Sequence, residues 1–256
     1  MLVPQDKLKS AVDKFVAHFS QELDQVEAIS GPSARTFRKA LAVSLLDALS
    51  ISTSSPRQSP RQYNRERFTN FVRTFSDWPD GKRVSLPHLV QLLRRNPDPA
   101  FEVVRRKATD MLTSWTPMHG TVVSIAEDPL PSVFETDWPR KPDMRAPLEG
   151  VTLERLTHYD LFYAYRNGLV HELRQPGYGF GSGHYDFPHY HELTTFSYGD
   201  RDTPGTETIE LVYPDVFILN LCRTAIVNLR DYLIRNKLNP YESYRFGTYW
   251  ISELNN

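Results

Sequence analysis

The chain has 256 residues, of which 40% are hydrophobic, and a formal net charge of −1. This length allows one large domain, or one core with a sizeable insertion. No apolar run approaches the roughly 18 residues of a membrane helix, and the first six residues lack a charged-then-apolar signal pattern. The lone cysteine, Cys222, allows no internal disulfide and sits in an apolar stretch, so we expect a buried thiol. We therefore expect a cytoplasmic protein without membrane contact.

Apolar residues recur every three or four positions over most of the chain, which is typical of amphipathic helices. The longest such stretches are 6–28, 152–173 and 214–236. Shorter helices are predicted after a capping Ser33, over 64–75, from Ser85-Leu86-Pro87 onward, and over 98–115. On the second helix, the residues predicted to face inward are Phe37, Leu41, Leu45, Leu46 and Leu49. The tail 241–250 is aromatic and is expected to pack across the helices.

Three segments break this helical pattern. Residues 50–62 are predicted to form a polar loop, and residues 129–150, which contain five prolines, a linker. Residues 177–213 are predicted to be an insertion made of a glycine-rich loop and a β-hairpin, with strands near 189–198 and 207–213. The predicted fold is thus a mainly α single domain over 1–256, a helical bundle with an inserted β-hairpin at about 189–213.

The segment Arg166-Asn167-Gly168-Leu169-Val170-His171 carries the residue types of a metal-independent RNA-cleaving site. An imidazole such as that of His171 can take the proton of a ribose 2′-hydroxyl near neutral pH. The guanidinium of Arg166 can neutralise the charge that builds on the phosphate, and Asn167 can orient either group. Because Arg166 and His171 are five residues apart, they lie about 140° apart around a helix. A second element must then supply the other wall of the site.

Gly168 lies in the middle of this predicted helix. A glycine there costs about 1 kcal/mol relative to alanine, which is explained if another backbone or a ligand comes close. We therefore expect a helix crossing at this point.

This segment resembles the HEPN superfamily, whose members share a helical bundle and an Arg-x4–6-His motif, often with a polar residue after the arginine. The resemblance implies a metal-independent endoribonuclease without cofactors, often a toxin or antiviral effector, in which two protomers pair so that both motifs face one groove. It also implies a homodimer through the Arg166–His171 helix, and RNA and an antitoxin or regulatory protein as partners. Toxins of the family neutralised by nucleotidyltransferases often have a tyrosine two residues after the histidine, where this chain has Leu173.

The same spacing occurs once more, from Arg83 to His88. Pro87 places that second copy at the start of a helix and not inside one, so we assign the function to Arg166–His171.

Basic residues elsewhere suit a polyanion, because guanidinium groups match phosphate geometry. Arg65, Arg67 and Arg174 are candidate substrate contacts, although such clusters also occur as solvated helix faces. Asp47, in an apolar stretch, needs a partner, which is Arg166 or another basic residue unless Asp47 lies on the helix rim.

Two other functions stay open. One is a non-catalytic HEPN-like module that binds RNA or protein. The other is a metal-dependent hydrolase that uses His184, His189 and His191, since three such groups can hold Zn²⁺. The preferred hypothesis assigns no metal.

Overall fold

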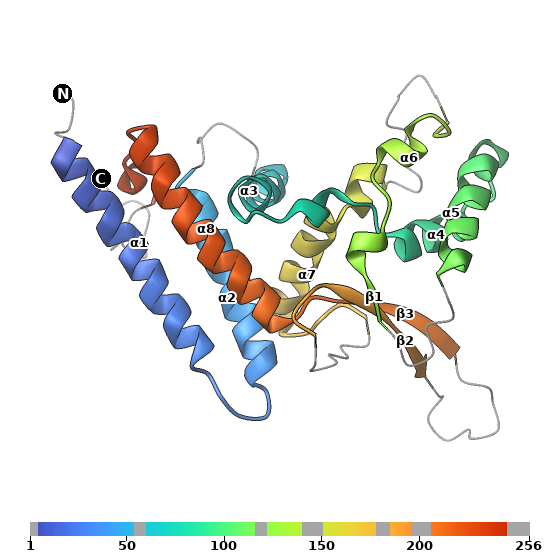
Figure 1. Cartoon of the computed structure of the whole chain (residues 1–256), viewed down its shortest axis with the longest axis horizontal. Coiled ribbons are helices and arrows are strands. Elements are labelled where there is room, and N and C mark those ends of the chain that lie inside the picture. The colour runs from blue at the N-terminus through green and yellow to red at the C-terminus, as the bar shows by residue number, and fades with distance from the viewer. Residues whose placement is uncertain are drawn as a thin grey trace. The chain divides into compact units, whose positions relative to one another are not determined.

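A computed structural model describes residues 5–53, 60–115, 122–139, 151–177, 185–195 and 206–244 (Figure 1). The described chain is mainly helical with a small antiparallel sheet, as predicted. It divides into two compact units. Unit 1 holds the described residues of 1–78, 169–173 and 218–256, and unit 2 holds those of 79–168 and 174–217. A single domain over 1–256 stays a prediction.

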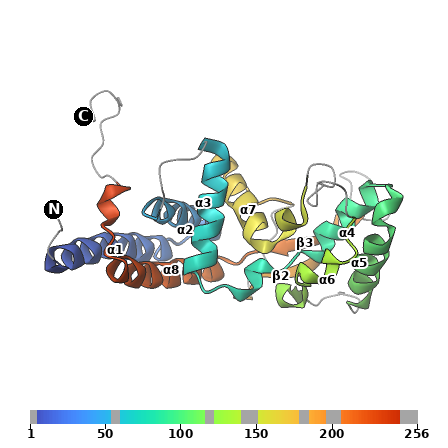
Figure 2. The ribbon, with the colours of Figure 1, turned by 90° about the horizontal axis from the view of Figure 1, so that it is seen from above.

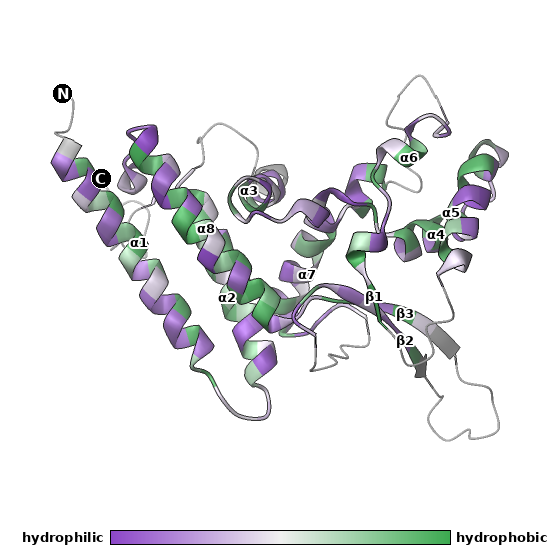
Figure 3. Cartoon of the chain, viewed as in Figure 1, coloured by the Kyte–Doolittle hydropathy of each residue, from purple (hydrophilic) through white to green (hydrophobic). Residues whose placement is uncertain are grey.

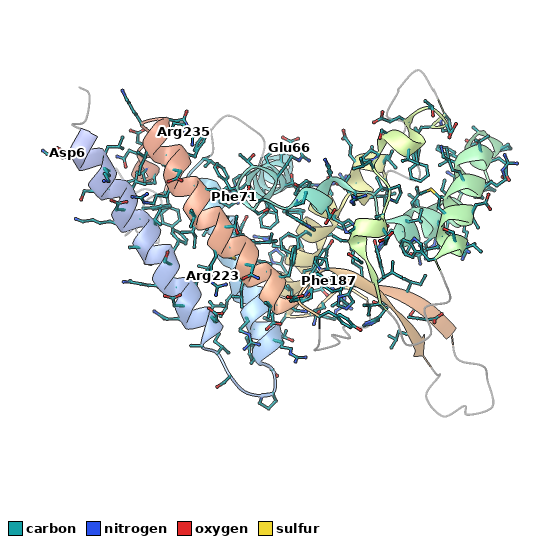
Figure 4. All side chains as sticks on the ribbon, in the orientation of Figure 1. Asp6, Glu66, Phe71, Phe187, Arg223 and Arg235 are labelled. Atoms are coloured by element: carbon teal, nitrogen blue, oxygen red, sulfur yellow. The ribbon has the colours of Figure 1, made fainter. Side chains whose placement is uncertain are left out.

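Unit 1 is built from helices whose apolar stripes face one another. Its elements are α1 (Gln5–Glu27), α2 (Ala34–Ile51), α3 (Pro60–Phe75), most of α8 (Asp215–Arg235) and the 3-10 turn η5 (Pro240–Glu242). Figure 3 shows hydrophobic and hydrophilic stripes along α1 and α8. These two helices run side by side (Figures 1 and 2), with Arg230 2.8 Å from Asp13 and Arg223 paired with Glu27. Figure 4 labels Arg223 on α8. The periodicity of both helices was predicted and is confirmed.

The inner face of α2 differs from the prediction. Leu46 and Leu49 are fully buried as expected, but Phe37 and Leu41 are 46% and 44% exposed. The helix instead turns Ala40, Ala42 and Val43 inward. Small side chains thus occupy the inner face of α2, and the larger Phe37 and Leu41 stay outside.

The loop predicted over 50–62 is shorter, because α2 continues to Ile51 and α3 already begins at Pro60.

The end of the described chain packs on α1. Tyr241 and Tyr244 place their rings edge-on against Phe15, with ring centroids 5.8 and 5.5 Å apart, and Tyr244 also contacts Phe19. This confirms the expected packing of the aromatic tail up to Tyr244; residues 245–256 lie outside the described part.

The Cys222 thiol is buried as predicted and donates to the carbonyl oxygen of Ala42. Burial raises the pKa of that thiol.

The sheet belongs to unit 2. Its strands are β1 (Val122–Ser124), β2 (His189–Thr195) and β3 (Thr206–Val212), antiparallel in the order β1-β2-β3. His189 pairs with Val212 in β3, and His191 pairs with Val122 in β1. The predicted strand pair is confirmed over 189–195 and 206–212; residues 196–205, which include the predicted turn at 199–205, lie outside the described part. We missed β1 because three residues are too few for a period-2 pattern.

Unit 2 has an apolar core of its own. The helices of this unit are η1 (Pro79–Lys82), α4 (Leu86–Arg95), η2 (Pro99–Phe101), α5 (Glu102–Ser114), η3 (Ile125–Glu127), α6 (Ser132–Glu135), η4 (Leu153–Leu156) and most of α7 (His158–Glu172). Leu89 and Leu93 of α4 and Val104 and Ala108 of α5 lie fully buried in that core. None of the helices in the described ranges of either unit is long and apolar enough to cross a membrane.

The last predicted helix of unit 2 starts later than expected, at His158 and not at residue 152. Backbone pairing explains the delay, since Ser85 N donates to Leu156 O at 2.9 Å and His158 N donates to Arg83 O at 3.0 Å. Thr157 between them is extended and forms a β-bridge with Val84. A residue held in this extended pairing cannot belong to the helix.

The proline-rich segment is not only a linker. Within 129–139 the chain forms α6, and Phe134 and Trp138 join the core of unit 2, with Phe134 fully buried. Lys107 of α5 bonds to Asp137 at 2.7 Å. The prediction of a linker was wrong for these residues, because apolar side chains between the prolines anchor the segment; residues 140–150 lie outside the described part.

The buried position of Phe134 can be tested by Phe134→Ala. Removing a fully buried phenylalanine should lower the free energy of unfolding by about 3–5 kcal/mol, measured by urea denaturation. Ser132→Ala, at an exposed position of the same short helix, should change it by less than about 0.5 kcal/mol. Equal, small effects of both substitutions would restore the linker interpretation.

Candidate functional site

The residues of the predicted site lie on one continuous helix, α7. The guanidinium of Arg166 donates to Asn167 Oδ1 at 2.9 Å and lies 6.0 Å from the centre of the Tyr163 ring. Both Arg166 and Asn167 are half-buried, whereas His171, in the last turn, is exposed. The helix thus presents a partly immobilised cation and an accessible imidazole about 140° apart around its axis.

Gly168 has a different role from the one predicted. A Cβ at this position would lie 2.9 Å from the carbonyl oxygen of Arg174 and 3.4 Å from Pro176. The chain turns back here because Leu173 adopts φ +50°, with Leu173 N donating to Leu169 O at 3.2 Å, a left-handed helix end. Arg174 N also bonds to Gly168 O at 3.3 Å. The close backbone is therefore this chain's own return and not a crossing helix.

Asp47 has a basic partner in Arg67, one of the alternatives that the sequence left open. Arg67 Nη2 lies 2.8 Å from Asp47 Oδ1, and its Nε donates to Ser50 Oγ at 2.9 Å. Both charged side chains are largely buried. The pair links α2 to α3 within unit 1, so Arg67 serves the bundle in place of the substrate contact predicted for it. Asp47 thereby supports the packing of α2 on α3.

The other two predicted substrate contacts fall in different units. Arg65 is half-buried on α3 in unit 1, and Arg174 is exposed just after α7 in unit 2.

Two of the three histidines in the predicted metal site lie on strand β2. His189 and His191 share a face of β2, with ring centroids 6.1 Å apart, and His189 donates from Nδ1 to the carbonyl oxygen of Phe187 at 2.8 Å. Burial lowers the pKa of His191. His184 lies outside the described residues. Within the ranges that are described, no three His, Cys, Asp or Glu side chains gather as a metal site would require.

A buried polar chain in unit 2 was not predicted. Asp128 Oδ2 lies 2.7 Å from His158 Nε2 and 2.6 Å from the Tyr190 hydroxyl oxygen. That oxygen lies 2.7 Å from Ser85 Oγ, which in turn lies 2.7 Å from Nδ1 of His88. All of these residues are fully buried except His88, which is half-buried.

Each hydroxyl has one proton to donate, and this fixes where the protons lie along the linked side chains, starting from Asp128. A carboxylate only accepts, so Tyr190 and His158 both donate to Asp128. Tyr190 has then used its one proton, and its contact with Ser85 requires the Ser85 proton. The contact between Ser85 and His88 therefore requires a proton on Nδ1 of His88. The neutral His88 ring therefore carries its proton on Nδ1, and its Nε2 keeps a lone pair.

The pKa shifts of these buried side chains agree with this arrangement of protons. Burial lowers the pKa of His88 to about 4, helped by repulsion from His158 and opposed by attraction from Asp128. Burial and the neighbouring Asp128 raise the pKa of the hydroxyls of Tyr190 and Tyr213 well above the ordinary value. His88 is therefore a neutral hydrogen-bond acceptor at neutral pH.

The segment that carries Ser85 and His88 is the Arg-x4-His copy set aside in the sequence. Arg83 itself is held by Asp80, Nε to Oδ1 at 2.7 Å, and by the carbonyl oxygen of Asp128. It therefore does not act with His88. The serine three residues before a histidine at a helix start was the available signal, but its partners Asp128 and Tyr190 are distant in sequence.

Comparison with known proteins finds no matching family model, no matching curated protein and no matching solved structure.

The lowered pKa of His88 predicts a specific acid sensitivity. Between about pH 6.5 and 4 the unfolded chain binds a proton at His88 that the folded chain does not, so stability falls as the pH drops through this window. His88→Asn keeps a donor toward Ser85 but cannot take up the proton. Its free energy of unfolding should fall less than the parent's over this window, by a difference on the order of 3 kcal/mol, measured by urea titrations at several pH values. Parallel curves for the two proteins would contradict the assignment.

Proposed function

We propose that this chain is a metal-independent endoribonuclease of HEPN type, with Arg166, Asn167 and His171 as its reacting groups. The observation that carries the proposal is the Arg166–Asn167 hydrogen bond on the helix that also exposes His171. A guanidinium held by its neighbour loses less freedom when it binds a phosphate, and an exposed imidazole can reach a ribose. The resemblance of the segment extends the proposal to a toxin or antiviral effector with RNA as substrate.

The reaction follows from these groups. His171 takes the proton of a 2′-hydroxyl, the 2′-oxygen attacks phosphorus, and the bond from phosphorus to the 5′-oxygen breaks. The leaving oxygen receives a proton from an imidazolium or from water. Arg166 stabilises the charge on the non-bridging oxygens as it builds. The products are a 2′,3′-cyclic phosphate and a 5′-hydroxyl, and no step requires a metal.

Pairing of two chains through α7 belongs to the same proposal. Because Arg166 and His171 point about 140° apart on one helix, a single α7 does not surround a phosphodiester. A second copy would supply the opposite wall in a two-fold arrangement. Since Gly168 is explained within the chain, the pairing is supported by this angular argument and by the resemblance.

The assembly can be measured directly. Light scattering should give twice the chain mass of 29.6 kDa at micromolar concentration. Leu173→Lys, at an exposed apolar position directly after α7, should shift this mass toward the single chain, whereas Val103→Lys on α5 should not. A monomer at all concentrations would refute the pairing.

The catalytic assignment predicts the behaviour of two alanine variants. His171→Ala and Arg166→Ala should each reduce cleavage of single-stranded RNA by about 10²-fold or more, measured by gel analysis of labelled oligonucleotides. Products should end in a 2′,3′-cyclic phosphate, and the DNA analogue should resist because it lacks the attacking hydroxyl. An excess of chelator should leave the rate unchanged.

Matched controls separate the competing functions. His18→Ala, at a half-buried position of α1, and Arg235→Ala, at an exposed position of α8, replace the same residue types and should keep full activity. Inhibition by chelator and inactivation by His189→Ala would favour the metal-dependent hydrolase. RNA bound but left intact by the parent protein would favour the non-catalytic module.

A further inference from the structure

A pocket of about 510 Å³ opens in unit 2. Its walls come from α4, α5, α7, β3 and the segment that returns after α7, all within this unit. Leu112, Leu161 and Ile209 supply apolar lining. The volume lies in the usual range for small-molecule sites, about 300–1,000 Å³, and polar and apolar side chains share the lining.

Among the polar side chains that line this pocket, three differ in charge: Arg94, Glu210 and His88. Arg94 lies in the last turn of α4, is exposed, and has no hydrogen bond or ion pair with any residue in the described ranges. Glu210 lies on β3, where its carboxylate covers Gly177; a Cβ on Gly177 would lie 2.0 Å from Oε2 of Glu210. The φ of +76° at Gly177 also favours glycine. Because Gly177 has no side chain, the Glu210 carboxylate can lie close to the backbone at the pocket wall.

His88 adds a directed acceptor. Its Nδ1 is occupied by Ser85 Oγ, and the order of protons from Asp128 outward leaves a lone pair on Nε2. Within the described part of the chain Nε2 has no partner. Among the polar groups that a ligand meets in this pocket are therefore one cation, one anion and one neutral acceptor.

We propose that this pocket binds a nucleoside monophosphate, with the phosphate at Arg94 and N–H or O–H donors of the base or ribose at Glu210 and His88 Nε2. A ligand with one anionic end and several donors on a partly apolar body fits this set of groups. A simple carboxylic acid offers no donors for Glu210 and His88. A free amino acid, which has both charges, would leave much of a 510 Å³ pocket empty.

His88 acts in this pocket through recognition and not through proton abstraction. Its pKa of about 4 makes it a poor base toward a hydroxyl, since the best general base has a pKa near the working pH. A lone pair whose direction is set by a buried chain instead selects donors over acceptors in the ligand. The buried residues Ser85, Tyr190 and Asp128 are positioning residues for this contact.

Calorimetric titration of the intact protein with AMP, GMP, CMP and UMP tests the proposal. At least one of the four should bind saturably, and its uncharged nucleoside should bind about tenfold or more weakly, because a charge-assisted contact contributes about 1.5–3 kcal/mol. Arg94→Gln should weaken the nucleotide by the same factor and leave the nucleoside unchanged. Arg95→Gln, the neighbouring exposed arginine that does not line the pocket, should leave both unchanged.

The role of His88 has its own variant. His88→Asn keeps the donor toward Ser85 and removes the acceptor in the pocket, so nucleotide and nucleoside should both weaken, by about fivefold to tenfold. Its melting curve at neutral pH shows whether the fold is intact, and His88→Gln, which places an amide oxygen or nitrogen near Nε2, should recover part of the affinity.

Two results would overturn the proposal: none of the four nucleotides saturates the protein at millimolar concentration, or Arg94→Gln and Arg95→Gln behave alike. The outcome is independent of the ribonuclease proposal, because His171→Ala should bind the nucleotide as the parent does.

Discussion

The carboxylate of Asp128 is the fixed point of unit 2. Its Oδ1 accepts from the backbone N–H of Leu86 at 2.8 Å, and its Oδ2 accepts from Tyr190 and His158. A fully buried charge without partners costs several kcal/mol, so the start of α4, strand β2 and the start of α7 must all meet at this carboxylate. The pocket depends on the same residue, since the proton order that begins at Asp128 leaves Nε2 of His88 as an acceptor.

The elements that could be predicted from the sequence are those whose own pattern is strong. The apolar period of α1 and α8 and the alternation in β2 and β3 are local properties, and the structure follows them. The start of α7 and the strand β1 are decided by pairing with other segments. Thr157 leaves the helix because Val84 pairs with it, and Val122 becomes a strand because His191 lies opposite. Neither pairing has a signature in the residues themselves.

The same distinction applies to the functional residues. The placement of Arg166, Asn167 and His171 on one helix followed from the apolar period of residues 152–173. The roles of Gly168, Arg67 and His88 did not, because each depends on a partner that only folding brings close. Gly168 meets a chain that reverses at Leu173, Arg67 meets Asp47 twenty residues earlier, and His88 depends on Tyr190 through Ser85. For a long cation or a mid-helix glycine, residue type alone allows both a structural and a functional role.

The buried polar chain also constrains how the protein is made. Ser85 and Tyr190 are separated by 105 residues, and Asp128 and Tyr190 by 62. During synthesis the α4–α5 pair can form early from neighbouring residues, but Asp128 has no hydroxyl partner until β2 has left the ribosome. At about 5–20 residues per second, the segment around Asp128 waits several seconds in contact with water. Unit 2 therefore closes late and from its C-terminal side, and a nascent chain halted before Tyr190 would hold α4 and α5 without a completed interior.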